Sequence, residues 1–392
     1  GRVVIAMEPD MEQLMEELHQ CRRCGICRNA VYDAKGFDGI CPVYENSTGF
    51  ETSFMRGKII VALALLNGEL ERTAENSESL FDCTLCGNCA QICPAEFEPA
   101  HTLEAVRGLL AEVPNQVRGE IAQKILSNNN PYGENNPRKR SWVSELDFDI
   151  PVNGETLYFV GCTAGMRIPK VAKNTAKILK ASGLGFAVLE DEPCCGSVLL
   201  RTGNPEAAAQ TAERVSKAIE ESGAERIVVS CAGCLKTLKE DFPNRFDIKL
   251  PEVLHILELV DDLIREGKLK LKALPGKNKV TYHDPCHMGR ELAIYESPRR
   301  VIQAIPNVNL VEMETNRETS MCCGAGGGLR SYNSDLAKNI ASKRVKDAIN
   351  TGANILATAC PFCEHNLLSG TKVLGDQMSI KDVVSLLAES VE

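Results

Sequence analysis

The cysteines are the residues of this chain whose type and spacing indicate a chemical role, because all eighteen of them fall into four groups. The first two groups have four members each: Cys21, Cys24, Cys27 and Cys41, then Cys83, Cys86, Cys89 and Cys93. The last two have five each: Cys162, Cys194, Cys195, Cys231 and Cys234, then Cys286, Cys322, Cys323, Cys360 and Cys363. A chain of 392 residues builds a core that does not need disulfides, so grouped thiols indicate metal ligands. The grouping predicts a carrier of several iron–sulfur clusters in a reducing compartment.

The second group reads C-x2-C-x2-C-x3-C-P, a spacing typical of bacterial ferredoxins with two clusters. In that pattern three close cysteines hold one cubane cluster, and the cysteine before the proline reaches to the neighbouring cluster. We therefore expect two cubane [4Fe–4S] clusters with exchanged ligands. One is held by Cys83, Cys86, Cys89 and Cys41, and the other by Cys21, Cys24, Cys27 and Cys93.

The first group departs from this pattern, because thirteen residues separate Cys27 from Cys41 where three are usual. We expect this insert, residues 28–40, to add a loop that leaves the ligation intact. A zinc site is the alternative for any single C-x2-C pair. The three-cysteine run and the Cys-Pro pair, which occur in both groups, favour iron–sulfur clusters.

The two five-cysteine groups repeat one design. They read C-x31-CC-x35-C-x2-C and C-x35-CC-x36-C-x2-C, and matching cysteines lie 124 to 129 residues apart. One apolar strand is predicted to end on Cys162 and another on Cys286, with helices at residues 168–183 and 205–223. Strands that alternate with helices imply parallel sheets, so we expect two duplicated α/β lobes that face each other.

The cysteines of these lobes lie where predicted strands end and helices begin. Helix N-termini offer free N–H groups and the positive end of the helix dipole, which stabilise thiolates and an anionic cluster. Gly196 and the glycine-rich stretch 324–328 are expected to let the backbone approach the cluster sulfurs. That stretch lacks the G-x-G-x-x-G spacing of a dinucleotide site, so neither NAD nor flavin is expected in this chain.

Helical periodicity predicts helices at residues 11–20, 57–70 and 101–126. The segment 127–141 is rich in Asn, Pro and Gly and predicts a linker. The expected fold class is α+β, an N-terminal helical ferredoxin-type domain followed by two duplicated α/β lobes. The expected boundaries are 1–126 for the helical domain, 127–150 for the linker, 151–275 for the first lobe and 276–392 for the second.

Composition argues against several classes of protein. A net charge of −9 argues against a nucleic-acid surface, and the basic run 138–140 is interpreted as a solvated part of the linker. The longest apolar run, residues 59–66, is far shorter than the ~20 residues of a membrane span. The first twenty residues lack the apolar stretch of a signal peptide. We therefore expect a cytoplasmic protein that reaches the cytoplasmic face of a membrane only through a partner.

The order of these parts resembles heterodisulfide reductase. The duplicated five-cysteine motif is similar to the cysteine-rich CCG domains of its B subunit, and the ferredoxin-type pair fused ahead of them resembles its D subunit. The likeness covers the ferredoxin pair, the connecting segment NNNPYGENNP at residues 128–137 and both five-cysteine motifs. A fused C-plus-B arrangement serving a soluble complex has the same order of parts.

This resemblance implies that each five-cysteine set binds a noncubane [4Fe–4S] cluster, so that these ten cysteines face the substrate. It also implies that the disulfide of coenzyme M and coenzyme B is held between the two clusters and is reduced there to two thiols. The electrons come through the ferredoxin-type clusters from a partner. That partner is either a membrane b-type cytochrome subunit or a flavin-containing subunit.

Residue chemistry supports the same function. Cleavage of a disulfide takes two electrons and a cubane cluster normally passes one, which gives a reason for two clusters at one site. A proton for the leaving thiolate could come from His283, His287 or His365, of which His287 is the predicted donor. The alternative at each position is a histidine that is merely packed or hydrogen-bonded. Four cations that follow cluster cysteines could receive a sulfonate, phosphate or carboxylate, but each is interpreted first as a surface residue: Lys236, Lys239, Arg290 and Arg330.

Two other functions stay open at this point. The layout also resembles the electron-relay iron–sulfur subunits of anaerobic glycerol-3-phosphate dehydrogenase and of glycolate or lactate oxidases. Both complete five-cysteine sets favour the disulfide reductase over the relay. A zinc-stabilised scaffold without a redox role is the third possibility, and colour and iron content would distinguish it.

Overall fold

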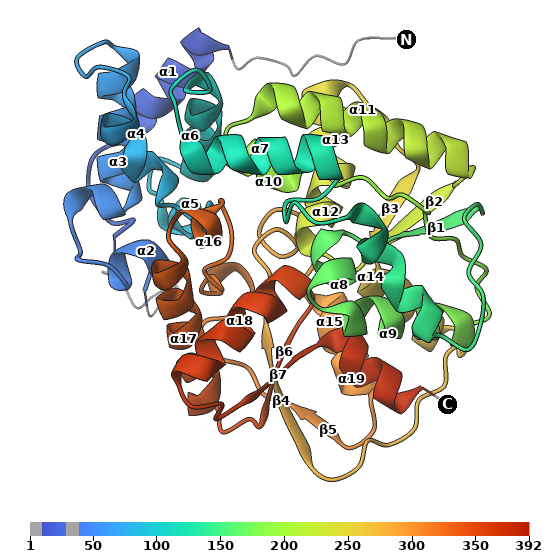
Figure 1. Ribbon diagram of the computed structural model, residues 1–392. Coiled ribbons are helices and arrows are strands. Elements are labelled where there is room, and N and C mark those ends of the chain that lie inside the picture. The colour runs from blue at the N-terminus through green and yellow to red at the C-terminus, as the bar shows by residue number, and fades with distance from the viewer. Residues whose placement is uncertain (1–9, 29–38, 392) are drawn as a thin grey trace.

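The computed structural model describes residues 10–28 and 39–391, which form a helical N-terminal part and two α/β lobes. In Figure 1 the helical part lies at the upper left, the first lobe at the right and the second lobe at the bottom. This arrangement confirms the predicted fold class. Most of the insert at residues 28–40 lies outside the described residues, so its loop stays a prediction.

The N-terminal part consists of short helices around an apolar core. They are α1 (Met11–Gln20), α2 (Pro42–Glu45), α3 (Met55–Leu66), α4 (Ala74–Phe81), α5 (Asn88–Ile92), α6 (Pro99–Leu109) and α7 (Gln116–Asn128), with a 3₁₀ turn at Glu51–Ser53. Helix α3 is the most apolar of them and packs against α1, α4 and α6. The predicted helix at 11–20 is confirmed. In the described part of the chain no helix is long and apolar enough to cross a membrane.

The predicted helix at 101–126 is in fact two helices, α6 and α7. Pro114 stands between them and supplies no N–H to continue a helix. Asn115 then starts α7, because its side chain accepts a hydrogen bond of 2.9 Å from the N–H of Arg118. The break turns α7 away from the N-terminal helices and lays it across the first lobe, beside α10 (Ser197–Arg201) and α11 (Pro205–Ser222) (Figure 1).

The first lobe is a parallel sheet of three strands in the order β1-β2-β3. The strands are β1 (Thr156–Phe159), β2 (Arg226–Val229) and β3 (Glu252–His255). Besides α10 and α11, its helices are α8 (Cys162–Met166), α9 (Pro169–Ala181), α12 (Ala232–Lys236), α13 (Phe242–Phe246) and α14 (Ile256–Arg265), with a π-helical turn at Thr237–Asp241. Strands β1 and β2 are apolar and almost wholly buried, as expected for a parallel sheet covered on both faces.

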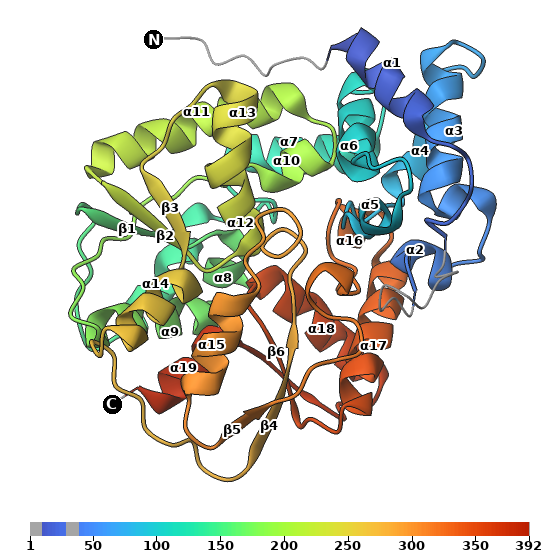
Figure 2. The same ribbon diagram turned by 180° about the vertical axis from the view of Figure 1, so that it is seen from behind.

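The second lobe repeats this plan with one more strand, in the order β5-β4-β6-β7, all parallel. Its elements are β4 (Asn278–His283), β5 (Val308–Leu310), β6 (Ile355–Thr358), β7 (Ser379–Asp382), α15 (Glu296–Ala304), α16 (Leu329–Tyr332), α17 (Ser334–Asn350), α18 (Pro361–Val373) and α19 (Val383–Ser390), with a 3₁₀ turn at Arg317–Thr319. Strands β4, β6 and β7 correspond to β1, β2 and β3. The counterpart of β5 is the single parallel bridge between Leu157 and Ala187. The predicted duplication is confirmed (Figure 2).

The segment predicted as a linker is packed against the first lobe. It contains a 3₁₀ helix, Asn136–Glu145, whose Trp142 is fully buried with its ring 6.3 Å from that of Tyr158. The solvated interpretation of the basic run fits Arg138, whose side chain is 61% exposed, and is wrong for Lys139, which is 3% exposed. The Lys139 ammonium can be buried because carbonyl oxygens of Asn129 and Glu192 accept its hydrogen bonds.

A single buried arginine joins the three parts of the molecule. Arg107, on α6, donates hydrogen bonds to the carbonyl oxygens of Leu80 and Cys83 in the helical part, of Arg201 in the first lobe and of Gly327 in the second. Its side chain is fully buried, and burial lowers its pKa below the ordinary value. Each carbonyl is thereby satisfied at a junction that water does not reach.

The glycine-rich stretch of the second lobe makes this junction close. A Cβ atom on Gly326 would lie 2.5 Å from the carbonyl oxygen of Thr84, and one on Gly327 would clash with the carbonyl oxygen of Cys83. Glycine is therefore required because two backbones touch. We expected this stretch to let the backbone approach the cluster sulfurs. That expectation is wrong for Gly326 and Gly327, which contact the backbone of the ferredoxin-type motif.

We predict that Arg107→Met destabilises the protein by at least about 3 kcal/mol, because four buried carbonyl groups lose their charged donor. The measurement is the thermal unfolding midpoint of the anaerobically purified protein. Arg72→Met is the matched control, since the Arg72 side chain is 40% exposed and pairs with the exposed Glu112. It should cost under about 1 kcal/mol. Equal midpoints for the two variants would contradict this role of Arg107.

Candidate metal centres

The structure places cysteines of the two N-terminal groups side by side, and the exchange of ligands between them stays a prediction. One apolar cavity is lined by Cys21, Cys24 and Cys27 of the first group and by Cys93 of the second. Cys89 also reaches its wall. Its remaining lining is largely apolar: Ile26, Met55, Ile59, Pro94, Ala95, Phe97 and Pro99.

Cys41 lies near cysteines of the second group. Burial raises the pKa of its thiol, and the neighbouring Cys83 and Cys86 raise it further. Cys89 likewise has its pKa raised by burial, then by Cys86 and Cys83. Cys41 therefore lies with the second group, although the sequence places it in the first.

In the first lobe the cysteines come from the ends of two strands and from the loop before α10. Cys162 is the first residue of α8 after β1, Cys231 is the N-cap of α12 after β2, and Cys234 lies within that helix. Cys194 and Cys195 precede Gly196, which starts α10 with a φ of +82°. The sulfurs of Cys195 and Cys234 are 3.3 Å apart, and Cys162 hydrogen-bonds Cys194.

The second lobe repeats this geometry. Cys360 is the N-cap of α18 after β6, Cys363 lies in its first turn, and Cys286 follows β4. The sulfurs of Cys323 and Cys363 are 3.3 Å apart, and Cys322 hydrogen-bonds Cys286. Cysteines stand where a strand ends and a helix begins at Cys162, Cys231 and Cys360, whereas Cys286 begins a turn and Cys322 and Cys323 lie in a loop.

Direct sulfur contacts connect the sets. The sulfurs of Cys231 and Cys360 lie 3.9 Å apart, so the two lobes present their sets to each other. Cys86 of the helical part hydrogen-bonds Cys322 of the second lobe, and this contact together with burial raises the pKa of Cys86 well above its ordinary value. The second lobe thus touches both the ferredoxin-type part and the first lobe.

The donor sets fit metal clusters. None of the eighteen cysteines forms a disulfide. Buried thiols share protons instead: hydrogen bonds from Cys194 and Cys234 lower the pKa of Cys195 well below its ordinary value, while Cys194 has its own raised to about 12. Several soft sulfur donors that converge in a buried site match iron–sulfur groups or zinc, and five at one site exceed the four of tetrahedral zinc.

Histidines lie close to these sets, but in different settings. Burial lowers the pKa of His287 to about 4, and that of His365 to about 4 as well. His283 is almost fully buried, and it forms with Cys323 and Cys363 a group whose ligand atoms lie within 4.8 Å of one another. The role of His287 as proton donor stays a prediction.

The cations that follow cluster cysteines are not free surface charges. Lys236 is buried with its Nζ 2.5 Å from Oδ1 of Asp241, and Lys239 is half-buried. Arg290 donates to the carbonyl oxygens of Cys86 and Ser320, each at 2.7 Å, and Arg330 donates to the Asn366 side chain. The surface interpretation is therefore wrong for Lys236, and the two arginines hold the structure together.

A small polar cavity lies where the three parts meet. His287 and Lys236 line it together with His101 and Glu291, whose Nε2 and Oε2 atoms are 2.7 Å apart. Glu104 and Arg201 also line it, and they form an ion pair of 2.8 Å between the helical part and the first lobe. The sequence shows that His287 is next to Cys286. It does not show the charged side chains that surround His287 in the folded protein.

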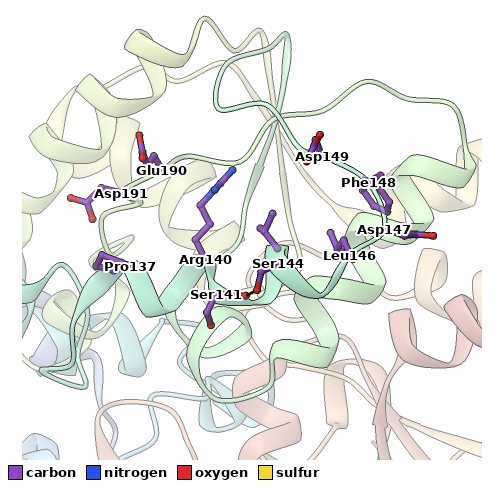
Figure 3. A pocket seen from close by; sticks show the side chains of 11 residues that line it. Pro137, Arg140, Ser141, Ser144, Leu146, Asp147, Phe148, Asp149, Glu190 and Asp191 are labelled. Carbon is purple, nitrogen blue, oxygen red and sulfur yellow. Dashed lines mark hydrogen bonds between the residues drawn. The ribbon is translucent and has the colours of Figure 1, made fainter.

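An open hollow of about 770 Å³ lies elsewhere, over the 3₁₀ helix and the loop before β1 (Figure 3). Arg140 points across it, and no cysteine is among its lining residues, which are Pro137, Arg140, Ser141, Val143, Ser144, Leu146, Asp147, Phe148, Asp149, Glu190 and Asp191. The lining of this hollow differs from that of the sulfur sites, and we assign the hollow no function.

Comparison with known proteins agrees with this organisation. Residues 17–97 match the 4Fe-4S dicluster domain, and residues 156–239 and 280–368 each match the cysteine-rich domain. A solved structure, that of a hypothetical protein from Helicobacter pylori, superposes on 97% of this chain and 73% of its own with a TM-score of 0.60 and 11% identity. That likeness concerns the fold alone.

Two curated relatives span almost the whole chain. The D subunit of the dihydromethanophenazine:CoB–CoM heterodisulfide reductase of Methanosarcina acetivorans is 36% identical over 97% of this chain and 95% of its own length. The B subunit of the CoM/CoB fumarate reductase of Methanothermobacter marburgensis is 30% identical over 99% of this chain and 75% of its own. The chain therefore belongs to the family of iron–sulfur oxidoreductase subunits that includes the D subunit of heterodisulfide reductase.

Proposed function

We propose that this chain is the catalytic subunit of a heterodisulfide reductase, which reduces the disulfide of coenzyme M and coenzyme B to two thiols. The observation that carries the proposal is the meeting of the two five-cysteine sets at Cys231 and Cys360, 3.9 Å apart and from different lobes. Two equivalent sulfur-rich sites that face each other suit a substrate with two sulfur atoms. The relative from Methanosarcina acetivorans, whose name states this reaction, supports the choice.

The proposed ligand sets follow the contacts. Cys21, Cys24, Cys27 and Cys93 hold one cubane [4Fe–4S] cluster, and Cys83, Cys86, Cys89 and Cys41 hold the other. The five cysteines of each lobe hold a noncubane [4Fe–4S] cluster. When bound, these groups supply the two electrons that cleavage of the disulfide requires.

The chain's own residues position the site and exclude water from it. Cys194, Cys195, Cys322 and Cys323 are buried, so their sulfurs are shielded from solvent. His287 lies next to Cys286 and borders the polar cavity with Glu291 and His101, whose side chain is 46% exposed. We propose that His287, neutral between transfers because its pKa is lowered to about 4, relays a proton to a leaving thiolate from Glu291 and His101, which lie between it and solvent.

The donor of electrons is proposed to be a separate subunit, either a membrane b-type cytochrome or a flavin-containing protein. It docks where the first ferredoxin-type group nears the surface, because Cys24 is exposed.

A second candidate function is an electron relay for another substrate. The continuous sulfur contacts from Cys86 through Cys322 favour it as well, and a relative that is named for fumarate reduction shows that the layout serves more than one reaction.

We predict that the anaerobically purified protein, loaded with iron, oxidises a reduced viologen dye when the coenzyme M–coenzyme B disulfide is added. Dye oxidation is followed by absorbance, and the two thiols are quantified at the end. An alkyl disulfide without charged groups is the substrate control and should react far more slowly. No turnover from protein with full iron content would favour the relay.

We predict that Cys195→Ser and Cys323→Ser each lower this turnover by more than about 100-fold, because loss of a ligand exceeds the 10–100-fold effect of losing a group that merely supports one. The electron paramagnetic resonance signals of the ferredoxin-type clusters should remain. Turnover at the wild-type rate in either variant would remove the five-cysteine sets from the reaction.

We predict that the crossed ligation appears in paired variants. Cys93→Ser should alter the same paramagnetic signal as Cys24→Ser, and Cys41→Ser the same signal as Cys86→Ser. The reason is that each cluster takes its fourth ligand from the other group. If Cys93→Ser instead altered the signal affected by Cys86→Ser, each group would hold its own cluster and the exchange would be wrong.

A further inference from the structure

The two five-cysteine sets are alike in sequence, but their surroundings differ. Beside each set lies a polar side chain that is not a cysteine, that is nine-tenths or more buried and that has no counterpart in the other lobe. In the first lobe it is Lys139, and in the second it is His283. The two side chains differ in charge and come from different places in the fold.

Lys139 belongs to neither lobe's repeat, since the 3₁₀ helix Asn136–Glu145 brings it in. Its ammonium donates to the carbonyl oxygens of Asn129 at 3.2 Å and of Glu192 at 2.5 Å. The same Asn129 carbonyl oxygen lies 3.9 Å from the sulfur of Cys162. The ammonium is thus held by two backbone acceptors, one of which also contacts a cysteine of the first set.

The fold holds Lys139 in this place. A Cβ atom on Gly165 of α8 would lie 2.5 Å from the Lys139 carbonyl oxygen, so glycine lets the two backbones meet. Glu192 lies 3.8 Å from the ammonium and accepts hydrogen bonds from the N–H groups of Val160 and Gly161, at 2.6 and 2.8 Å. The carboxylate therefore anchors both the lysine and the strand end that carries Cys162.

His283 is oriented by Arg344. The Nε atom of this arginine donates to Nδ1 of His283 at 3.3 Å, and Thr315 fixes the guanidinium through two hydrogen bonds of 2.9 Å. An arginine never accepts, so Nδ1 is the acceptor and the ring proton lies on Nε2. Nε2 is buried without a hydrogen-bond partner, and the ring lies with Cys323 and Cys363 in a group whose ligand atoms are within 4.8 Å of one another.

Neither Lys139 nor His283 has a counterpart in the other lobe. His283 lies three residues before Cys286, and the residue three before Cys162 is Phe159, which is fully buried and apolar. Lys139 precedes the first lobe, outside the repeated unit. Arg290 lies near Cys286 and Cys322, but its hydrogen bonds go to the carbonyls of Cys86, Glu318 and Ser320.

We propose that Lys139 and His283 are positioning residues that tune the two five-cysteine sites separately, Lys139 through Cys162 and His283 through Cys323. This inference rests on the proposed iron–sulfur groups at both sets. A hydrogen bond or a positive charge at a ligating sulfur stabilises the reduced group and raises its reduction potential. The two sites thereby accept electrons at different reduction potentials. Each half of the substrate then faces a site with a different potential.

The test is a redox titration of the full-length, iron-loaded protein, followed by electron paramagnetic resonance. Lys139→Met should shift the oxidised-to-reduced ratio of the first-lobe signal at least tenfold, about 59 mV for one electron, toward lower potential. The second-lobe signal should stay in place. His283→Phe should do the reverse and lower only the potential of the second-lobe signal.

Matched variants separate tuning from damage to the fold. Lys139→Arg and His283→Gln keep a donor and should stay close to the wild-type potentials. Arg138→Met, at an exposed neighbour of Lys139, and Tyr282→Phe, on the opposite face of β4, should leave both potentials unchanged. The proposal is overturned if neither potential moves, if both move together in each variant, or if the donor-keeping variants shift as far as Met and Phe. These potentials are measured without turnover, so the disulfide assay can fail while this inference stands.

Discussion

The buried guanidinium of Arg107 is the interaction on which the arrangement of the sulfur sites depends. It holds carbonyl groups of the helical part and of both lobes, one of them that of the ferredoxin-type cysteine Cys83. Because Gly326 and Gly327 allow backbone contact at the same place, the second lobe sits directly on the ferredoxin-type motif. The contact between Cys86 and Cys322 follows from that seating.

Each lobe positions a cysteine in the same way. A buried strand ends, a helix begins, and a cysteine at the junction meets free N–H groups at the positive end of the helix. Duplication supplies two such sites, and packing of the lobes sets Cys231 against Cys360. The symmetry of the strands and cysteines does not extend to the side chains around them, since Lys139 and His283 give the two sets different surroundings.

Much of this could be predicted from the sequence, because the signals are local. The helix at 11–20 and the strands before Cys162 and Cys286 follow from periodicity. The break between α6 and α7 was also readable, since Pro114 is followed by a capping Asn115. What could not be predicted depends on contacts between distant segments. Lys139 looks like a solvated cation until Asn129 and Glu192 accept its hydrogen bonds, and the glycines at 326 and 327 gain their meaning only from Thr84 and Cys83.

The most direct test of the central claim, that the two five-cysteine sets form one divided site for a disulfide, is a crystal structure of the anaerobic protein with the coenzyme M–coenzyme B disulfide. Diffraction data collected at the iron absorption edge would locate the metal. The account predicts iron in both five-cysteine sets and the two substrate sulfurs between them, near Cys231 and Cys360. Zinc in these sets, or a substrate bound away from the junction of the lobes, would contradict it.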